Sequence, residues 1–398
     1  MSDAPGPEGS DGAGALRVPD GRLSGLDVLR RARTDRKAAR AQLRGVSPEA
    51  LASACQDLRP EARNEFLMLV DHPEHVVPHL PDAELCFTIR AGGMSEAAWL
   101  LEMATPRQRQ ACVDLDVWQG AELTHERALE WVDALIEAGR EVLVRGIEQL
   151  DPEFWILSLK RMADVVVIGR EDERPEGFFT EDGVVYFRAH ADEDFARVKE
   201  IMQTAFSESQ PYYWNMVHGM LFELPTECEE YALRWRTGRL ADLGFPERDW
   251  AMRVYRPLEL DQVETVDVTR AHEGEVHALV ARSDLPRQLR GSLVGEALTR
   301  LPGDRAGDVL GYILGVANCL AVADGLSLSD AESIPHALDK AVSGIDQGLR
   351  EVCRARDQAP EVVIETTRPL DLFRVGLTSR GTAAGERDVS SAGARRDG

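Results

Sequence analysis

The chain has 398 residues, with 46 basic residues (lysine and arginine) against 69 acidic ones, and a formal net charge of −23 at pH 7. A chain of this length can form two or three domains with a substantial core. The acidic balance argues against a general affinity for nucleic acid or anionic membranes, because the long-range field of the protein repels phosphate. We therefore expect no nucleic-acid partner, while a local basic patch stays compatible with this balance.

Residue usage also indicates a compartment. The lysines are confined to Lys37, Lys160, Lys199 and Lys340, so arginine carries almost all the positive charge, as is typical of a GC-rich bacterial genome. The 6 cysteines are scattered without CxxC spacing, which favours reduced, buried thiols over disulfides or a zinc site. The first residues lack the basic and apolar regions of a signal peptide. We therefore expect a cytoplasmic protein.

Residues 1–46 are predicted to form a tail and a basic helix. Residues 1–24 are rich in glycine, proline and aspartate and should be disordered. In "LDVLRRARTDRKAARAQLR", Leu26, Leu29 and Leu43 make a thin apolar stripe. We interpret this segment as a solvated helix, with a helix that docks on a partner or a membrane surface as the alternative.

Between residues 47 and 163, short apolar-periodic runs begin repeatedly after a capping residue and a proline or glutamate. Examples are "SPEALASACQDL", "TPRQRQACVDL" and "LDPEFWILSLKRM". Proline suits the first helical position, and a serine, threonine or aspartate before it accepts the free N–H groups of the first turn. None of these runs is long enough to form a stable helix alone. We therefore predict an array of short, stacked antiparallel helices over residues 47–163.

Residues 164–191 change to a β-like pattern. "DVVVI" at 164–168 is typical of a strand, and "FFTEDGVVYF" at 178–187 holds two β-rich runs around an Asp-Gly turn. We predict a small β-hairpin or three-stranded sheet that packs on helices, since it could not be stable alone.

Helices are predicted to resume after this insertion. The expected regions are a helical segment over 192–258, a second helical block over 259–377 with long helices near 305–323 and 330–355, and a disordered tail over 378–398. The most apolar run, 309–323, contains Asn318 and falls short of the roughly 20 residues that span a bilayer. We predict a buried core helix there and no membrane span. The fold class expected overall is mainly α, with a small β-hairpin insertion.

Several stretches carry a resemblance to a known family: "LLEMATPRQRQACVDLDVW", "ERALEWVDALIEA", "LDPEFWILSLKRM", "FFTEDGVVYF", "ELPTECEEYALRWRTGRLADLGFP", "ANCLAVADG" and "LDLFRVGL". Their order, over residues 47–377, resembles an uncharacterised bacterial domain-of-unknown-function family common in myxobacteria and their relatives. This resemblance implies no particular activity.

A further resemblance covers residues 80–160. "LPDAEL" and "EAAWLLEMATPRQRQACVDLD" resemble the cytosolic superhelical N-terminal domain of bacterial magnesium transporters. The resemblance implies stacked short helices and a magnesium-responsive acidic surface. The chain lacks that family's nucleotide-binding-like pair and its membrane domain, so a transport role does not carry over.

Two histidine tracts could suggest a metal. In "HEGEVH", His272 and His277 are five residues apart, whereas the HExxH zinc motif needs a spacing of four on one helix face. In "DHPEHVVPH", residues 71–79, two prolines accompany three histidines. A divalent site is conceivable there, but we interpret the tract as a surface loop. We expect no metal and no cofactor.

Asp114 and Asp116 in "DLDVW" form the other candidate for Mg²⁺. On a helix their side chains would point about 200° apart, so joint chelation would need a turn. We interpret both as capping or solvated residues. In "QPYYWNMVHGMLFEL", helical spacing of apolar residues predicts a buried face, with a ligand-lining face as the alternative; its members are Trp214, Val217, Met220 and Leu221.

The stretch "YALRWRTGRLADLGFP", residues 231–246, is predicted to be the end of a helix. Thr226 and Glu229 fit a capping box at its start, and Gly244 fits the left-handed position after its end. Gly238 suggests a kink or a close helix contact. The spacing i, i+3, i+4, i+7 predicts one buried face, composed of Cys228, Tyr231, Ala232 and Trp235.

Arg236 and Arg239 are the candidate site residues, as a surface that binds an anion or a protein partner. Arg239 follows Trp235 on the predicted buried face, so it must either extend past the edge of the core or meet a buried acid. We expect a cytoplasmic helical interaction or scaffold protein with a protein partner. The alternatives are an enzyme with an unrecognised site and a magnesium-responsive regulatory protein.

Overall fold

The computed structural model describes residues 23–169, 176–268, 289–330 and 333–379. The predicted disorder of residues 1–24 and 378–398 falls almost wholly outside these ranges. Residues 23, 24, 378 and 379 are exceptions, because Ser24 caps a helix that begins at Gly25 and residues 378 and 379 belong to a helix over 369–379. The described residues are mainly helical, with two small antiparallel sheets of two strands each. The predicted fold class is therefore confirmed.

The N-terminal half is a succession of short helices, which the capping pattern predicted from residue 47 onward. They are α1 (Gly25–Ala32), α2 (Arg36–Leu43), α3 (Pro48–Gln56), α4 (Pro60–Leu67), η2 (Pro73–His75), η3 (Val77–His79), α5 (Asp82–Gly92), α6 (Met94–Ala97), α7 (Trp99–Met103), α8 (Pro106–Asp116), α9 (His125–Glu137), α10 (Arg140–Gln149) and α11 (Pro152–Met162). Proline opens several of them, and Thr105 and Gln108 form a capping box before α8. The interpretation of residues 25–45 as one solvated helix is wrong, because they form two helices that bury Val28, Leu29 and Leu43.

The predicted β insertion is present, and its first strand follows α11 without a connecting loop. β3 (Ala163–Val167) pairs antiparallel with β4 (Val185–Ala189), and Phe179 makes an isolated bridge to Phe187. The Asp182 carboxylate accepts hydrogen bonds from the main-chain N–H groups of Val184 and Val185 in the turn that precedes β4. A second, shorter ribbon joins α8 to α9 and consists of β1 (Trp118–Gln119) and β2 (Glu122–Leu123).

The described residues that follow β4 are mainly helical. Their elements are α12 (Asp192–Glu208), α13 (Gln210–Phe222), α14 (Pro225–Asp242), α15 (Arg248–Ala251), η4 (Met252–Tyr255), η5 (Leu260–Gln262), α17 (Leu293–Arg300), α18 (Gly303–Ala323), α19 (Ser333–Arg356) and α20 (Pro360–Thr366). The two long helices expected near 305–323 and 330–355 correspond to α18 and α19.

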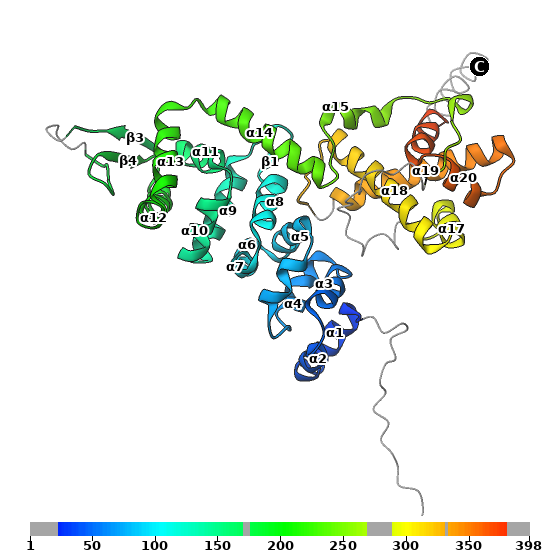
Figure 1. Cartoon of the computed structure of the whole chain (residues 1–398), viewed down its shortest axis with the longest axis horizontal. Helices are drawn as coiled ribbons and strands as arrows, with labels where there is room; N and C mark the ends of the chain where they lie inside the picture. Colours follow the sequence, from blue (N-terminus) through cyan, green and yellow to red (C-terminus); the bar gives the residue numbers. More distant parts are fainter. Residues whose placement is uncertain (1–22, 170–175, 269–288, 331–332, 380–398) are drawn as a thin grey trace, which may run out of the picture.

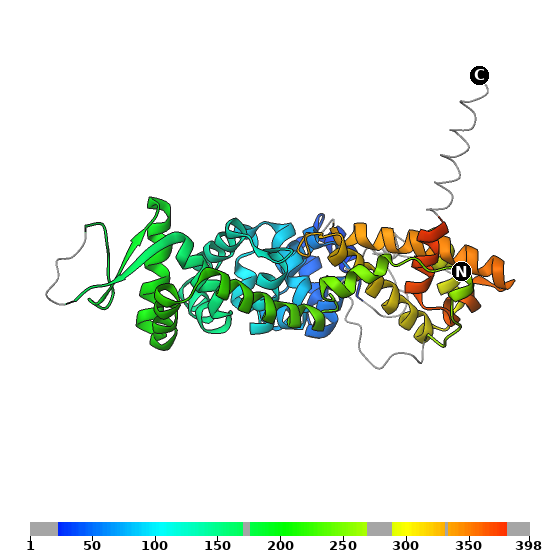
Figure 2. The ribbon, with the colours of Figure 1, turned by 90° about the horizontal axis from the view of Figure 1, so that it is seen from above.

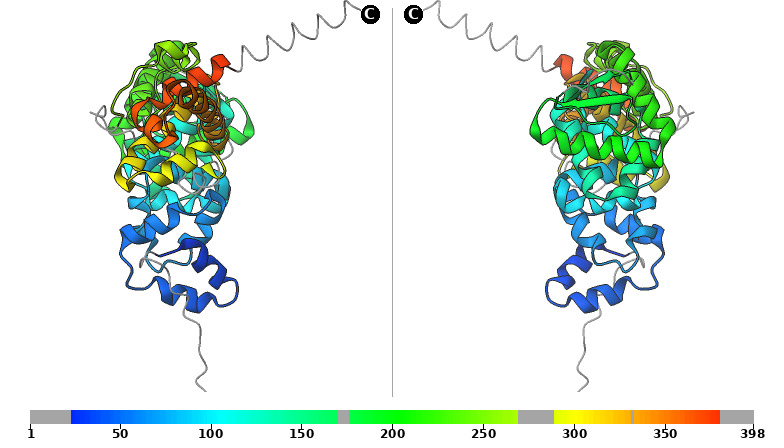
Figure 3. Two further views of the ribbon diagram at one scale, coloured as in Figure 1. Left: turned by 90° about the vertical axis from the view of Figure 1, so that its right-hand side faces the viewer. Right: turned by 90° about the vertical axis from the view of Figure 1, so that its left-hand side faces the viewer.

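The helices form an elongated molecule in which α14 connects two arms. Figure 1 shows α9–α13 with β3–β4 on one side, α15–α20 on the other, and α1–α5 as a stem below. The hairpin and the α17–α20 block lie at opposite ends of the long axis (Figure 2), and the end views show the stem projecting beneath both arms (Figure 3). α14 therefore contacts segments that are distant in sequence.

α18 lies in the core of the second arm. Among the described helices it is long and apolar enough to cross a membrane by length and composition, which is weak evidence for a span. In that apolar window 56% of the residues are buried inside the fold. Asn318 is fully buried, and its Nδ2 donates a hydrogen bond to the Gly244 carbonyl at 3.0 Å. This burial supports the core-helix interpretation.

Candidate binding site around helix α14

α14 turns a different face to the core from the predicted one. Trp235 is 60% exposed and Tyr231 is 58% exposed, so the prediction that both point inward is wrong. The buried residues follow a spacing of four along the helix and are Cys228, Ala232, Arg236 and Leu240. The buried face of α14 thus contains Arg236, whereas the hydrophobic pattern predicted Trp235 there.

Arg236 is buried against the end of α8 and the β1–β2 turn. Its Nε donates to the main-chain oxygen of Asp114 at 2.6 Å, and its Nη1 donates to that of Gly120 at 3.1 Å. Its guanidinium carbon lies 5.3 Å from the centre of the Trp118 ring, a cation–π distance. Burial lowers the pKa of Arg236 to about 10, so the group still carries its charge at pH 7.

Arg239 forms the ionic connection between α14 and the helical array. Its guanidinium binds the Asp114 carboxylate through Nε at 2.6 Å and Nη2 at 2.9 Å, and it reaches Asp151 Oδ2 at 2.5 Å. Burial lowers the pKa of Arg239, but its hydrogen bonds and ion pairs with these two carboxylates outweigh that effect and raise it. Of the two alternatives left open by the sequence, Arg239 therefore meets a buried acid.

Asp114 and Asp116 are both buried, so their interpretation as capping or solvated residues is wrong. Asp114 also accepts a hydrogen bond from Gln110 Nε2 at 3.0 Å. Asp116 accepts one from Trp131 Nε1 at 2.8 Å and lies 3.4 Å from Arg90 Nε. Burial raises the pKa of both carboxyl groups despite these partners. The two side chains serve separate ion pairs.

A cavity of about 300 Å³, which we call the Arg236 cavity, lies beside this network. Its wall comes from three distant parts of the chain: the β1–β2 turn, the end of α14 with α15, and the end of α18. Representative lining residues are Trp118, Arg236, Phe245, Arg248, Val322 and Leu326. The sequence singled out Arg236 but contained no signal for this cavity, because residues from separate elements build it.

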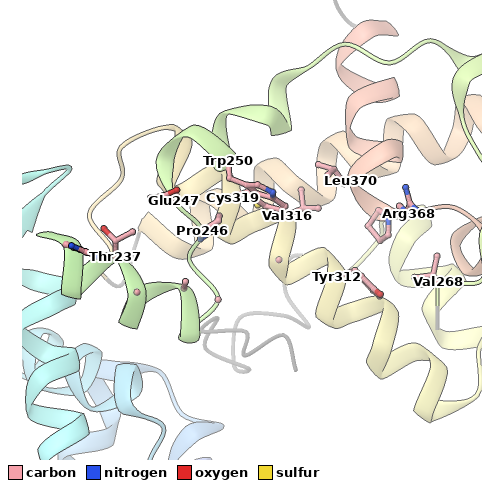
Figure 4. A pocket seen from close by; sticks show the side chains of 16 residues that line it. Thr237, Pro246, Glu247, Trp250, Val268, Tyr312, Val316, Cys319, Arg368 and Leu370 are labelled. Carbon is pink, nitrogen blue, oxygen red and sulfur yellow. The ribbon is translucent and has the colours of Figure 1, made fainter. Parts of the chain in front are cut away.

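A larger hollow of about 930 Å³, which we call the Trp250 cavity, adjoins it along the neighbouring face of α14. Figure 4 shows Thr237 near one end, Trp250 and Val316 along the middle, and Arg368 near the other end. Thr237, Pro246 and Glu247 line both cavities. The wall of the Trp250 cavity is mostly apolar, with charges supplied by Arg234, Glu247 and Arg368.

Other predictions for this region have mixed outcomes. Gly244 has φ +87° and the Phe245 N–H bonds the Leu240 carbonyl at 2.8 Å, which confirms the predicted helix stop. The capping box is wrong, because α14 begins at Pro225 without a side-chain cap. The close helix contact predicted at Gly238 is wrong too, since nothing lies within 4 Å of an added Cβ, while the alternative of a kink there stays a prediction.

The aromatic run on α13 differs partly from the prediction. Val217 and Met220 are buried as expected, but Trp214 is 47% exposed. Its neighbour Tyr213 is fully buried, and its hydroxyl donates to Asp182 Oδ2 at 3.0 Å. At the start of α13 the buried residue is therefore Tyr213 instead of Trp214, because the Tyr213 hydroxyl finds a hydrogen-bond acceptor in the turn before β4.

Within the described ranges, no group of three or more histidine, cysteine, aspartate or glutamate side chains is arranged to hold a metal ion. His75 lies in η2, His79 lies in η3, and His72 directly precedes η2. The Nδ1 atom of His72 pairs with Glu74 Oε1 at 3.1 Å. The tract with His272 and His277 lies outside the described residues.

Comparison with known proteins identifies a family. The model described as "Family of unknown function (DUF6178)" matches residues 40–382. No curated protein and no solved structure matches the chain. The predicted membership of an uncharacterised family is confirmed, while the resemblance of residues 80–160 to magnesium transporters is not shown. The binding of an anion or a partner by Arg236 and Arg239 stays a prediction.

Proposed function

The chain belongs to this family of unknown function, and we propose that it is a helical interaction protein of the bacterial cytoplasm. The α14–α15 surface would bind an amphipathic, acidic helix of a protein partner. The observation that carries this proposal is the exposure of large apolar side chains on and beside α14, next to an apolar cavity. The free thiols of Cys55, Cys86, Cys112, Cys228, Cys319 and Cys353 support a reducing compartment.

The exposed apolar residues follow the chain from the end of α13 to α15. Phe222 is 69% exposed, Leu224 59% and Trp250 49%, in addition to Tyr231 and Trp235. Large exposed apolar side chains along one segment are typical of interaction sites, and tryptophan and tyrosine are enriched among the residues that dominate binding energy.

The Trp250 cavity continues this surface. Gly238, one turn after Trp235, lines the cavity, and nothing lies within 4 Å of a Cβ added there. A groove of this type accepts the apolar face of a helix, whose side chains anchor at i, i+3, i+4 and i+7. The cavity would take the anchors, and Trp235 would cover the edge of the bound helix.

Charge indicates the kind of partner. Neither Arg234 nor Arg368 forms an ion pair with another residue in the part of the chain that the structure describes. Both line the cavity, so a bound helix with acidic residues would pair with them. The overall net charge of −23 opposes an acidic partner as well as a second copy of this chain, so an acidic helix is favoured only by its local pairing with Arg234 and Arg368.

The proposal can be tested by capture from the native cytoplasm with wild type, Trp235→Ala and Phe195→Ala. Phe195 is 42% exposed on α12, in the other arm, and serves as the matched aromatic control. A partner segment recovered with wild type and the control should then be purified and titrated by calorimetry. We expect Trp235→Ala to weaken its binding at least tenfold and added salt to weaken it further. Equal affinity for all three proteins, or a stable homodimer in light scattering, would contradict the proposal.

A further inference from the structure

We infer that the Arg236 cavity is a binding site for a small organic carboxylate with an apolar body. The guanidinium of Arg236 would hold the carboxylate, and the surrounding apolar residues would enclose the body. This inference does not depend on the proposed protein partner, because Arg236 and Trp118 line only the Arg236 cavity, although the two cavities share part of their walls.

The charge of Arg236 has no carboxylate partner among the described residues. The residue is 6% exposed, and among the described residues its guanidinium interacts with two main-chain oxygens and the Trp118 ring. Nη2 donates no hydrogen bond within the described ranges, and Arg236 lines the cavity. A buried cation without a counter-ion is costly, and a carboxylate matches the fork of a guanidinium with two oxygens.

The neighbouring acids form no ion pair with Arg236, although the charge of Asp114 favours its protonated form from beyond ion-pair distance. Both oxygens of Asp114 already accept hydrogen bonds from Arg239, and Gln110 donates to one of them. Asp151 is bound by the same arginine at 2.5 Å and 3.3 Å. Because these bonds hold the two carboxylates away, Asp114 reaches Arg236 only through its main-chain oxygen.

The size and lining of the cavity define the ligand. About 300 Å³ is the lower end of the range for small-molecule pockets. Apolar side chains form much of the wall; they are Trp118, Leu233, Leu240, Phe245, Val322, Leu326 and Leu328. The Trp118 ring lies beside the guanidinium, so a flat or branched apolar group attached to the carboxylate would lie against it.

The rim favours a single negative charge. Arg248 is exposed on the rim and adds a second cation, but Glu247 and Asp249 are exposed there as well. These two carboxylates would repel a phosphate monoester dianion more strongly than a carboxylate monoanion. The arrangement therefore favours an aromatic or branched aliphatic acid over a phosphorylated ligand.

The experiment titrates the whole protein with benzoate, phenylacetate and isovalerate, with benzamide as the neutral analogue and phenyl phosphate as the dianion. Binding would be measured by calorimetry and by the indole N–H resonance of Trp118, assigned with Trp118→Phe. We expect at least one acid to bind saturably and to shift this resonance. Benzamide and phenyl phosphate should each bind at least tenfold more weakly than benzoate.

Arg236→Gln should abolish saturable binding, and Arg234→Gln, which lines the other cavity, should bind like wild type. Since Arg236→Gln could unfold the protein, Ala121→Trp provides a second variant. Ala121 is exposed at the cavity wall, so a tryptophan there should block the cavity without removing the buried charge. Binding of the acids should fall at least tenfold in this variant.

Three results would each overturn the inference. The first is that none of the acids binds in the millimolar range to folded wild type. The second is equal binding of benzoate and benzamide. The third is unchanged binding in Ala121→Trp, or equal losses in Arg234→Gln and Arg236→Gln. The Trp235→Ala capture experiment is a separate measurement, so failure of the carboxylate site and failure of the partner surface can be distinguished.

Discussion

Arg239 of α14 holds the Asp114 carboxylate of α8 with two hydrogen bonds, Nε to Oδ2 at 2.6 Å and Nη2 to Oδ1 at 2.9 Å, although 125 residues separate them. The Asp114 side chain is 2% exposed and that of Arg239 is 31% exposed. This pair fixes α14 against the helical array, and it determines which face of α14 is buried.

We predict that Arg239→Met lowers the free energy of unfolding by about 3–5 kcal/mol, because it leaves the buried Asp114 charge without its main partner. Asp114→Asn should cost a similar amount, and the double variant should lose clearly less than the sum of the two. Urea unfolding measures all three. The exposed Arg248→Met, which breaks no described ion pair, should stay within about 0.5 kcal/mol of wild type. Additive losses would mean that the pair is not coupled.

The two tryptophans Trp235 and Trp155 should respond in opposite ways to truncation. Trp235→Ala should change the free energy of unfolding by less than about 1 kcal/mol, because the ring is mostly solvated. Trp155 is 1% exposed and donates from Nε1 to the Gly146 carbonyl at 3.1 Å, so Trp155→Ala should cost about 3–5 kcal/mol. Urea unfolding curves of both variants provide the test. A loss at Trp235 comparable to that at Trp155 would show that Trp235 is buried in solution.

Two helical glycines should differ in the sign of the effect of an alanine substitution. A Cβ at Gly348 of α19 would lie 1.8 Å from the main-chain oxygen of Leu372, so α19 and the helix over 369–379 would have to separate. Gly348→Ala should destabilise the fold by about 1–3 kcal/mol or more. Gly238→Ala meets open space and should stabilise α14 by up to about 1 kcal/mol. Thermal unfolding of both variants checks the prediction, which fails if the two shifts have the same sign.

Protonation of His190 should stabilise the junction of α11, β3 and β4. Its Nδ1 lies 2.9 Å from the Arg161 carbonyl and its Nε2 lies 3.1 Å from Asp164 Oδ1, so both ring nitrogens face acceptors. These hydrogen bonds, first that with Asp164, raise the pKa of His190 above the ordinary histidine value of about 6.5. The stabilisation is therefore fully present below the unfolded pKa, and it is lost as the pH rises through the higher folded pKa.

His190→Gln measures this contribution. The difference in unfolding free energy between wild type and variant should be largest below about pH 6 and should shrink as the pH rises above the folded pKa. An NMR titration of the ring should show directly that the pKa is raised. A folded pKa at or below the unfolded value, or a stability difference that grows between pH 6 and pH 8, would refute the assignment.

Local signals were sufficient to predict where many elements begin and end. Thr105 and Pro106 open α8, Ser47 and Pro48 open α3, and Gly244 ends the α14 segment in the left-handed conformation. Such signals depend on a few neighbouring residues, since a proline, a cap or a positive φ acts within one turn.

The face that α14 buries and the cavities beside it were decided by the tertiary structure. Hydrophobic periodicity predicted burial of Trp235 rather than Arg236. It considers only how apolar each side chain is and takes no account of partners distant in sequence. The main-chain oxygen of Asp114, 122 residues before Arg236, provides a buried acceptor that makes burial of the arginine favourable. The sequence by itself determined that this stretch is a helix with candidate arginines; packing against α8 determined their direction, because charge and hydrogen-bond partners are set by contacts between distant residues.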